Sequence, residues 1–224
     1  MKRFVKWILS CLRLLEIIQN IHFKLRYRNS GDYWQMRYAK GGTSGSGSYG
    51  ELAAYKAEII NSLIEKESID TVVEWGVGDG NQLSYLMCKT YLGLDVSQAA
   101  IDICKKRFEG DSSKTFCVVG DDFTLMKKFD LSLSLDVIFH LTENRVFEAY
   151  IKNLFKSSNR FVCIYSSNFI RERTMHEKHR NFTEYIERTV RNFDLMEVIK
   201  NRYPFDPTRA SETSISDFYI YKKT

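Results

Sequence analysis

The stretch "VVEWGVGDGNQL", residues 72–83, decides what fold this chain can adopt. An apolar run ends at Trp75, and glycines follow at every second position, Gly76, Gly78 and Gly80. Glycine has no Cβ, so the backbone can turn sharply here and a ligand can lie against it. A strand that ends in such a turn predicts a binding site at its carboxyl end.

The segments around this turn alternate between strand and helix patterns. Such alternation predicts a doubly wound α/β sheet, in which ligands bind beyond the carboxyl ends of the strands. Ser97 is the expected cap of one helix. We expect helices over residues 52–64, 98–108, 143–155 and 181–191, a short helix through Leu86, and strands over residues 71–75, 90–96, 115–120, 129–137, 160–166, 194–203 and 215–223.

The length and composition of the chain suit a single domain with one hydrophobic core. The chain has 224 residues, of which 44% are hydrophobic. A net charge of +5 suits an anionic small substrate, a membrane surface or nucleic acid, and does not choose among them. The five cysteines form no CxxC pair, which predicts reduced thiols in a cytoplasmic protein. His176 and His179 have helical spacing but no evident third ligand, so we expect no metal site.

The N-terminal segment is apolar and basic. Lys6, Arg13 and Glu16 interrupt it, so it contains no run of the roughly 18 apolar residues that a spanning helix needs. Its helical apolar spacing favours a helix that packs on the core or on a second subunit. The alternative is a basic amphipathic helix at the inner face of the membrane. We expect an N-terminal helix and a Gly/Ser-rich loop over residues 1–48, and the main domain over residues 49–224.

The glycine spacing separates two kinds of cofactor site. A NAD-binding turn reads GxGxxG, whereas this turn reads GxGxG, with Asn81 where the third glycine would fall. Glu74 precedes the turn and Asp95 ends the next predicted strand. This order resembles the first motif of class I S-adenosylmethionine-dependent methyltransferases, over residues 50–224. The resemblance implies a Rossmann-like, seven-stranded, mostly parallel sheet with an antiparallel last strand. It also implies S-adenosylmethionine as cofactor and S-adenosylhomocysteine as product.

The same resemblance assigns the cofactor residues. In that family the glycine turn lies against the methionine part, and the acid that ends the second strand, here Asp95, binds the ribose hydroxyls. The loop "GDDF" supplies Asp122 and Phe123 to the adenine, and "DLSLSLDVIFHL" places Asp136 near the methyl group. The resemblance therefore predicts a cofactor site made of Glu74, Gly76, Gly78, Gly80, Asp95, Val96, Asp122, Phe123 and Asp136.

Methyl transfer is an in-line displacement, so positioning contributes most of the catalysis. A hydroxyl acceptor also benefits from a general base, which an already anionic oxygen does not need. His140, four residues after Asp136, is the candidate base or acceptor-orienting group, and the two form the predicted catalytic pair. The alternative for His140 is a core histidine bonded to backbone.

Two segments are candidates for contact with the acceptor. In "DYWQMRYAKGGTSGSGSYG", aromatic residues and Arg37 adjoin a Gly/Ser-rich loop that could form an anion cradle or a lid, or be a plain linker. In "RERTMHEKHRNF" the basic residues could bind phosphate, or could be a solvated helix face. The predicted acceptor-binding residues are Arg37, Tyr38, Ser46, Ser48, Tyr165, Arg171, His176 and Arg180.

The acceptor class follows from what the motifs contain. The "DVIF" sequence stands where amino-group nucleic-acid methyltransferases carry D/NPPY, and no RNP-like segment occurs, so we expect no DNA partner and disfavour RNA. The loop motifs are similar to small methyltransferases of bacterial capsule and surface-glycan gene clusters, including those of O-methyl phosphoramidate biosynthesis. That resemblance implies O-methylation of a small anionic acceptor: a phosphoramidate, sugar or nucleotide-linked intermediate.

Three alternatives remain open from the sequence. The first is RNA methylation, which a strong salt dependence of binding would support. The second is a non-catalytic, cofactor-binding scaffold subunit of a glycan-assembly complex. The third is a nicotinamide oxidoreductase, which Asn81 disfavours.

Overall fold

A computed structural model describes residues 29–120, 125, 127–171 and 176–224. The expected first helix within residues 1–28 lies outside the described residues, as do the predicted adenine-binding residues Asp122 and Phe123. Among the helices of the described ranges, none is both long and apolar enough to cross a bilayer.

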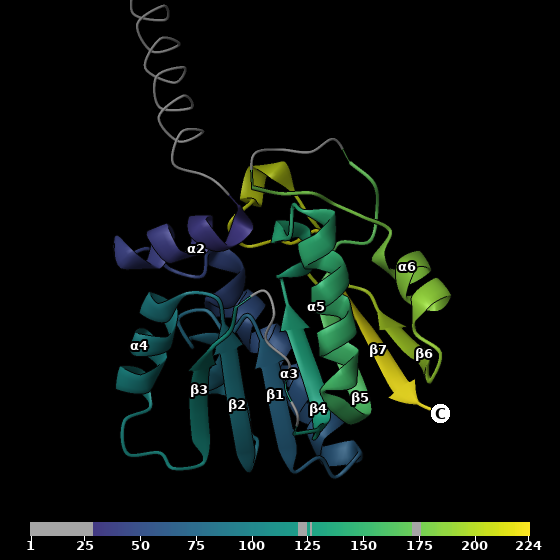
Figure 1. Cartoon of the computed structure of the whole chain (residues 1–224). Coiled ribbons are helices and arrows are strands. Elements are labelled where there is room, and N and C mark those ends of the chain that lie inside the picture. The colour runs from purple at the N-terminus through teal and green to yellow at the C-terminus, as the bar shows by residue number, and fades with distance from the viewer. Residues whose placement is uncertain (1–28, 121–124, 126, 172–175) are drawn as a thin grey trace, which may run out of the picture.

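Seven strands form one twisted sheet in the order β3-β2-β1-β4-β5-β7-β6 (Figure 1). The pairs among β1 to β5 are parallel, and β7 is antiparallel to both β5 and β6. This confirms the mostly parallel sheet with an antiparallel last strand. The strands are β1 (Thr71–Trp75), β2 (Thr90–Asp95), β3 (Lys114–Val118), β4 (Phe129–Leu135), β5 (Ser158–Ser166), β6 (Phe193–Ile199) and β7 (Asp217–Lys223).

Helices cover both faces of the sheet. In Figure 1, α3 lies behind the strands and α5 in front of them, while α2 lies above the carboxyl ends of the parallel strands. The glycine turn is followed only by a 3₁₀ turn, η2 (Gln82–Tyr85), so the expected short helix is a single turn. The helices are α2 (Ser30–Ala39), α3 (Gly50–Lys66), α4 (Gln98–Arg107), α5 (Asn144–Lys156) and α6 (Phe182–Thr189), with further 3₁₀ turns η1 (Ser46–Ser48), η3 (Ile138–His140) and η4 (Pro207–Arg209).

Two apolar clusters, one on each face, hold these layers together. Successive strand residues point to opposite faces. Val72 therefore packs in the cluster that contains Ile60 of α3, whereas Val73 packs in the cluster that contains Ile151 of α5. Because β1 pairs with β2 on one side and β4 on the other, the strand order reverses between β1 and β4. Ligands of open α/β sheets bind at this reversal.

Helix α2 is an element that the sequence did not predict. Asn29 caps it by accepting a hydrogen bond from the Asp32 amide at 2.8 Å. Only Ser30 and Tyr38 of the helix are buried, because its aromatic face lies over a cavity rather than over the core. A hydrophobic pattern finds helices that pack on a core, and α2 has no such stripe.

Candidate active site

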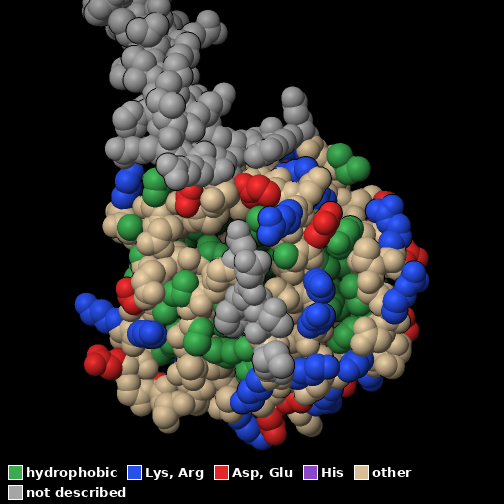
Figure 2. Space-filling view, viewed as in Figure 1, with side chains coloured by type: hydrophobic (Ala, Val, Ile, Leu, Met, Phe, Trp, Pro, Cys, Tyr) green, Lys and Arg blue, Asp and Glu red, His purple; other side chains and the backbone are tan. Residues whose placement is uncertain are grey.

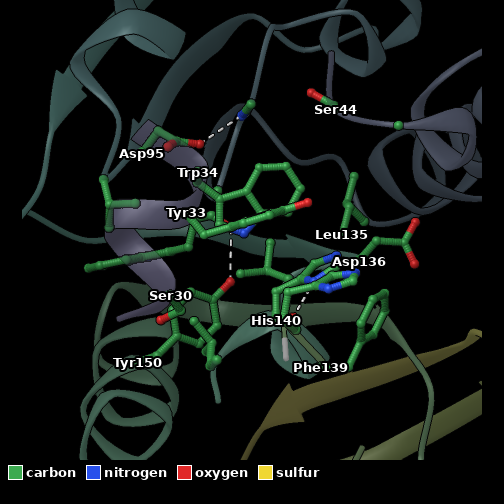
Figure 3. Close-up of a pocket in the computed structure, with 18 of the residues that line it drawn as sticks. Ser30, Tyr33, Trp34, Ser44, Asp95, Leu135, Asp136, Phe139, His140 and Tyr150 are labelled. Atoms are coloured by element: carbon green, nitrogen blue, oxygen red, sulfur yellow. Dashed lines mark hydrogen bonds between the residues drawn. The ribbon is translucent and has the colours of Figure 1, made fainter. Parts of the chain in front are cut away.

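A cavity of about 760 Å³ lies at the point where the strand order reverses. Its volume falls within the range of pockets that enclose a small-molecule ligand. Figure 3 shows Asp95 on one side of the cavity, and Asp136 and His140 on the other. The walls come from the glycine turn, the ends of β2 and β4, α2, the Gly/Ser-rich loop, α5 and the segment before β7.

The first two glycines of the turn shape this cavity. Gly76 and Gly78 line it, with φ angles of 87° and 61° that favour glycine. A Cβ on Gly76 would lie 2.5 Å from Val137, and one on Gly78 would lie 2.3 Å from the Ser44 hydroxyl. Gly80 is not part of the lining, and its α-carbon faces Cys104 of α4. The structure thus places two of the three predicted glycines at the cavity and the third in helix packing.

Asp95 ends β2 and is almost fully buried. Its two carboxylate oxygens accept hydrogen bonds from the amides of Gly78 and Ser97, each at 2.9 Å. Burial raises its pKa to about 6, and the amide hydrogen bonds partly oppose this shift. The amides fix the orientation of the carboxylate, which lines the cavity beside the half-exposed Val96.

Glu74 also lines the cavity, from within β1. It is 2% exposed and accepts a hydrogen bond from the Tyr91 hydroxyl of β2. Burial raises its pKa to about 7, against the opposing effect of the Tyr91 hydrogen bond. The carboxyl end of β3 leads directly to Val119 and Gly120, which line the same cavity before the undescribed residues begin.

Asp136 follows β4 with a φ of 58°, in the left-handed region that aspartate tolerates better than most residues. One carboxylate oxygen accepts from the Lys56 ammonium at 3.0 Å and the other from the Ser216 hydroxyl at 2.8 Å. The Lys56 side chain is 1% exposed. Neither partner was among the predicted site residues. Lys56 was detectable in principle, because it interrupts the apolar stripe of α3 between Leu52 and Ile60.

His140 ends the 3₁₀ turn after Asp136 and lines the cavity. Its Nδ1 lies 3.1 Å from the backbone oxygen of His176. A carbonyl oxygen only accepts hydrogen bonds, so Nδ1 carries the hydrogen and Nε2 carries a lone pair. Burial lowers the pKa of His140 to about 4, so the ring is neutral near pH 7. The indole of Trp34 meets the imidazole edge-on at 4.9 Å.

Helix α2 is fastened over the cavity by its side chains. The amide and hydroxyl of Ser30 both donate to the Glu143 carboxylate, at 3.1 and 2.8 Å. The Tyr33 ring stacks on His176 at 5.4 Å. Tyr33, Trp34, Arg37 and Tyr38 all line the cavity, so the aromatic segment singled out from sequence forms part of its wall.

The Gly/Ser-rich loop is fastened to the glycine turn. The Ser44 amide donates to Asp79 at 2.9 Å, and the Asp79 amide donates to the Ser44 hydroxyl at 3.0 Å. Tyr49 adds a further hydrogen bond to Asp79 at 2.7 Å. Ser46 and Ser48 of this loop line the cavity. The loop is therefore an ordered wall of the site, and the interpretation as a plain linker is wrong.

Arg37 of α2 holds the Gly/Ser-rich loop in place. Its Nε donates to the Thr43 oxygen at 2.6 Å, and its guanidinium lies over the Trp34 ring at 5.4 Å. Arg37 lines the cavity, and a second of its donors bonds the Tyr33 hydroxyl at 3.2 Å.

Some basic residues of the segment 171–182 line the cavity, and others bond to the surrounding backbone. Arg171 and His176 line the cavity, whereas Arg180 lies outside its lining. The Arg180 guanidinium donates to the backbone oxygens of Leu141 and Thr142, which positions the chain after His140. Its placement is a correction to the prediction, because a long side chain can turn back onto local carbonyls.

Tyr165 is a second such correction. It is buried in β5 outside the cavity lining, and Asn201 donates to its hydroxyl at 2.8 Å. The structure adds Arg145, in the first turn of α5, which lines the cavity and was not predicted. Among the described residues, Arg145 has no hydrogen-bond or ion-pair partner. The described ranges also contain no group of three or more histidines, cysteines or carboxylates able to hold a metal ion.

Comparison with known proteins agrees with this geometry. Residues 73–163 match the family model of a methyltransferase domain. No curated protein matches the sequence.

Solved structures of similar fold include the N-methyltransferase NodS from Bradyrhizobium japonicum, in complex with S-adenosylhomocysteine. It is 14% identical with a TM-score of 0.69, over 87% of this chain and 98% of that one. The methyltransferase domain of bacterial CtHen1-C is 18% identical with a TM-score of 0.59, over 77% and 99% of the two chains. Magnesium protoporphyrin IX methyltransferase from Synechocystis is 14% identical with a TM-score of 0.56, over 76% and 83%. At these identities the likeness shows the fold.

Proposed function

We propose that this chain, an S-adenosylmethionine-dependent methyltransferase with a class I, Rossmann-like fold, methylates an oxygen atom of a small anionic acceptor. One observation carries the proposal. A single cavity joins the cofactor-type residues Asp95, Gly76 and Gly78 to Asp136 and His140. A methyl donor and an acceptor bound in that cavity would be neighbours, and close positioning is what a displacement reaction needs.

The residues present fit the cofactor. A carboxylate held in place by two amides, as in Asp95, can accept hydrogen bonds from both hydroxyls of a ribose. The space beside Gly76 and Gly78 is too narrow for a side chain but admits a ligand against the backbone. When bound, S-adenosylmethionine supplies a methyl group on a positively charged sulfur. The Glu74 carboxyl, in its ionised form, favours such a positive charge nearby, whereas Asp136 is already paired with Lys56.

The cover formed by α2 and the Gly/Ser-rich loop favours a small acceptor. The Ser30–Glu143 and Ser44–Asp79 hydrogen bonds hold this cover over the cavity, whose volume of about 760 Å³ is that of a small-molecule site. Figure 2 shows the side of the molecule on which α5 lies, where Lys and Arg side chains occur among Asp and Glu.

The charges of the acceptor side favour an anion. Arg145 and Arg171 both line the cavity. Arg171 donates to Nε2 of His179 at 3.1 Å and forms an ion pair at 3.8 Å with Glu177, a carboxylate that also lines the cavity. Two of the carboxylates in the wall are already engaged, Glu143 by Ser30 and Asp136 by Lys56. Arginine side chains are well suited to phosphate and carboxylate groups.

More specifically, we propose that the acceptor is a phosphoramidate, sugar or nucleotide-linked intermediate of bacterial capsule biosynthesis. This choice of acceptor is based on the resemblance of the loop motifs to methyltransferases of capsule gene clusters. Structural neighbours with other acceptors, such as the magnesium protoporphyrin IX enzyme, share the fold, so the fold itself does not choose the acceptor. We place the enzyme in the cytoplasm, where the basic segment 1–28 would bring it to the inner membrane if that segment binds lipid.

Cofactor binding provides the first test. Calorimetric titration of S-adenosylmethionine should show that Asp95→Ala weakens binding by about tenfold or more, because two hydrogen bonds to a charged group are lost. Asp102→Ala is the matched control, since it removes an exposed carboxylate on the neighbouring α4 whose side chain accepts from Gln98 alone among the described residues. Equal affinity of wild type and Asp95→Ala would contradict the assignment.

The reaction itself is tested on small metabolites. An extract of a capsule-bearing bacterium is incubated with ¹³C-methyl S-adenosylmethionine and either the wild type or Asp95→Ala. We expect at least one anionic metabolite to gain a methyl group with the wild type only. Cofactor binding without methylation of any metabolite would instead favour a macromolecular acceptor such as RNA, or the scaffold role.

A further inference from the structure

We propose that the methylated atom is the oxygen of an un-ionised hydroxyl group, which donates its hydrogen to Nε2 of His140, while the negative charge of the acceptor lies apart from it at Arg145 and Arg171. This inference rests on the proposed function and narrows it. The substrate class is an alcohol or phenol that carries a separate phosphate or carboxylate. A phosphoramidate or phosphate oxygen would not be the methylated atom.

The hydrogen bonding of His140 determines what its free nitrogen can do. Nδ1 is committed to the His176 carbonyl, and Nε2 has no hydrogen-bond partner within the described part of the chain. The ring lines the cavity, so Nε2 is the nitrogen available to a ligand. A nitrogen lone pair accepts a hydrogen bond and repels an anionic oxygen. The site is therefore matched to an O–H group.

Packing holds this tautomer and this orientation. Trp34 meets the ring edge-on at 4.9 Å, and Phe139 lies against it at 4.4 Å. His176 lies parallel to it at 6.3 Å, and is itself stacked under Tyr33. Rotation of the imidazole would break the bond to the carbonyl and disturb these contacts, so Nε2 stays directed to the cavity.

Burial keeps the His140 ring neutral, against the net effect of the charged groups around it. Burial is the largest influence and lowers the pKa to about 4. The His176 carbonyl and the carboxylates of Glu177 and Asp136 favour the protonated ring but do not outweigh burial, and the charge of His176 opposes protonation. His140 therefore has an accepting Nε2 throughout the range in which enzymes of this kind work.

The reaction balances with His140 in this role. The hydroxyl oxygen forms a bond to the methyl carbon, and the electrons of the carbon–sulfur bond leave with the sulfur. The oxygen would become positively charged, so its proton passes to Nε2. A neutral imidazole of low pKa cannot ionise a resting alcohol, but the hydrogen becomes far more acidic as the new bond forms, so the transfer is downhill late in the step. The imidazolium then loses its proton to water.

The same chemistry excludes the other nucleophiles. An ionised phosphate or phosphoramidate oxygen has no proton to transfer, so Nε2 would face it without function. A methylated aliphatic amine holds its proton far more tightly than this buried imidazole, so it would not transfer that proton to His140. Among the oxygen nucleophiles considered, a hydroxyl group is the one that carries a hydrogen for this lone pair to accept.

The first experiment needs no acceptor. Long-range ¹H–¹⁵N NMR on the full-length protein, assigned with the His140→Gln variant, reports which nitrogen carries the hydrogen. We expect a neutral ring with the hydrogen on Nδ1 at pH 7. An imidazolium, or a hydrogen on Nε2, would overturn the proposal.

The second experiment identifies the methylated atom. The products of the ¹³C-methyl labelling are analysed by NMR, in which a P–O–CH₃ group shows ¹³C–³¹P coupling and an N-methyl carbon differs in shift from a methyl ether. We expect a methyl ether on a molecule that keeps its anion. A methyl group on a phosphorus-bound oxygen or on nitrogen overturns this inference but leaves the proposed function intact. Failure to methylate any metabolite overturns both.

Substitutions test separately the roles proposed for His140 and for Arg145. His140→Gln places an amide where the imidazole lies but cannot take up a proton, so kcat should fall by about 100-fold or more while cofactor affinity is unchanged. Arg145→Gln should raise KM for the acceptor by about tenfold with a smaller effect on kcat. Arg188→Gln, an exposed arginine on α6, is the control. Full activity of His140→Gln, or an unchanged KM in Arg145→Gln, would contradict the assignment of that residue.

Discussion

Replacing Lys56 by methionine should destabilise the protein strongly. The ammonium of Lys56 is 1% exposed and pairs with Asp136 at 3.0 Å, above the ring of Tyr165 at 5.2 Å. Methionine has a similar length and fills the same apolar space, so the change removes the charge without leaving a large cavity. What remains is the Asp136 carboxylate, which keeps only its hydrogen bond from Ser216 among the contacts given by the described residues.

The size of the effect follows from burial. Breaking a buried ion pair from one side costs about 3–5 kcal/mol, because an uncompensated charge is left behind. The Asp136 side chain is 20% exposed, so water and Ser216 relieve part of the penalty. We therefore expect a loss near the lower limit, about 3 kcal/mol. Such a loss is a large fraction of the stability of a typical domain.

A double-mutant cycle measures the pair itself. Urea denaturation of the wild type, Lys56→Met, Asp136→Asn and the double variant gives the coupling energy, which we expect to be about 2 kcal/mol. Asparagine tolerates the left-handed φ of Asp136, so backbone strain does not enter. Lys89→Met is the control, because Lys89 and Asp70 pair at 2.7 Å in full contact with water and should contribute nothing measurable. Additive single losses, or a Lys56→Met variant as stable as the control, would refute the reasoning.

Three further results are expected. Asp79→Asn should speed tryptic cleavage after Lys40 and weaken cofactor binding about tenfold, because the Gly/Ser-rich loop loses hydrogen bonds to the glycine turn. An unchanged rate of proteolysis would show that Asp79 does not hold the loop in place. Glu74→Gln should be as stable as the wild type below pH 4.5, and more stable than the wild type above pH 7 by up to about 3 kcal/mol. The reason is that folding raises the pKa of the Glu74 carboxyl to about 7, so the wild type loses stability as this carboxyl ionises with rising pH. Denaturation curves that differ equally from the wild type at both pH values would contradict this. Trp34→Ala should raise the pKa of His140 from about 4 toward its usual 6.5, as water reaches the ring, and an NMR titration that still gives about 4 would show that Trp34 does not bury it.

The local features of the sheet were predictable from short stretches of sequence. The alternation in β1 sends Val72 and Val73 to opposite faces, and the glycines after Trp75 permit the positive φ angles of the turn. Strand and helix patterns depend on neighbours a few residues apart, so a short window contains the information. Asp95 could be placed at the cavity for the same reason, because the end of a strand is a local property.

The partners of the site residues depended on the topology. Lys56 and Ser216 each lie 80 residues from Asp136, and only the packing of α3 and the segment before β7 brings them to its carboxylate. Residue type did not show whether a basic side chain would line the cavity or bond to nearby backbone carbonyls. Arg171 lines the cavity, whereas Arg180 turns back to the carbonyls of Leu141 and Thr142.

Apart from α2, the sequence by itself determined the order of strands and helices along the chain, the glycine turn and the carboxylates at the strand ends, because each of these is decided by residues close together in the chain. The tertiary structure alone decided that α2 covers the cavity, that the Gly/Ser-rich loop is fastened to Asp79, and that the free nitrogen of His140 is Nε2. These features are contacts between groups far apart in the chain. They exist only once folding has brought these groups together and burial has excluded competing water.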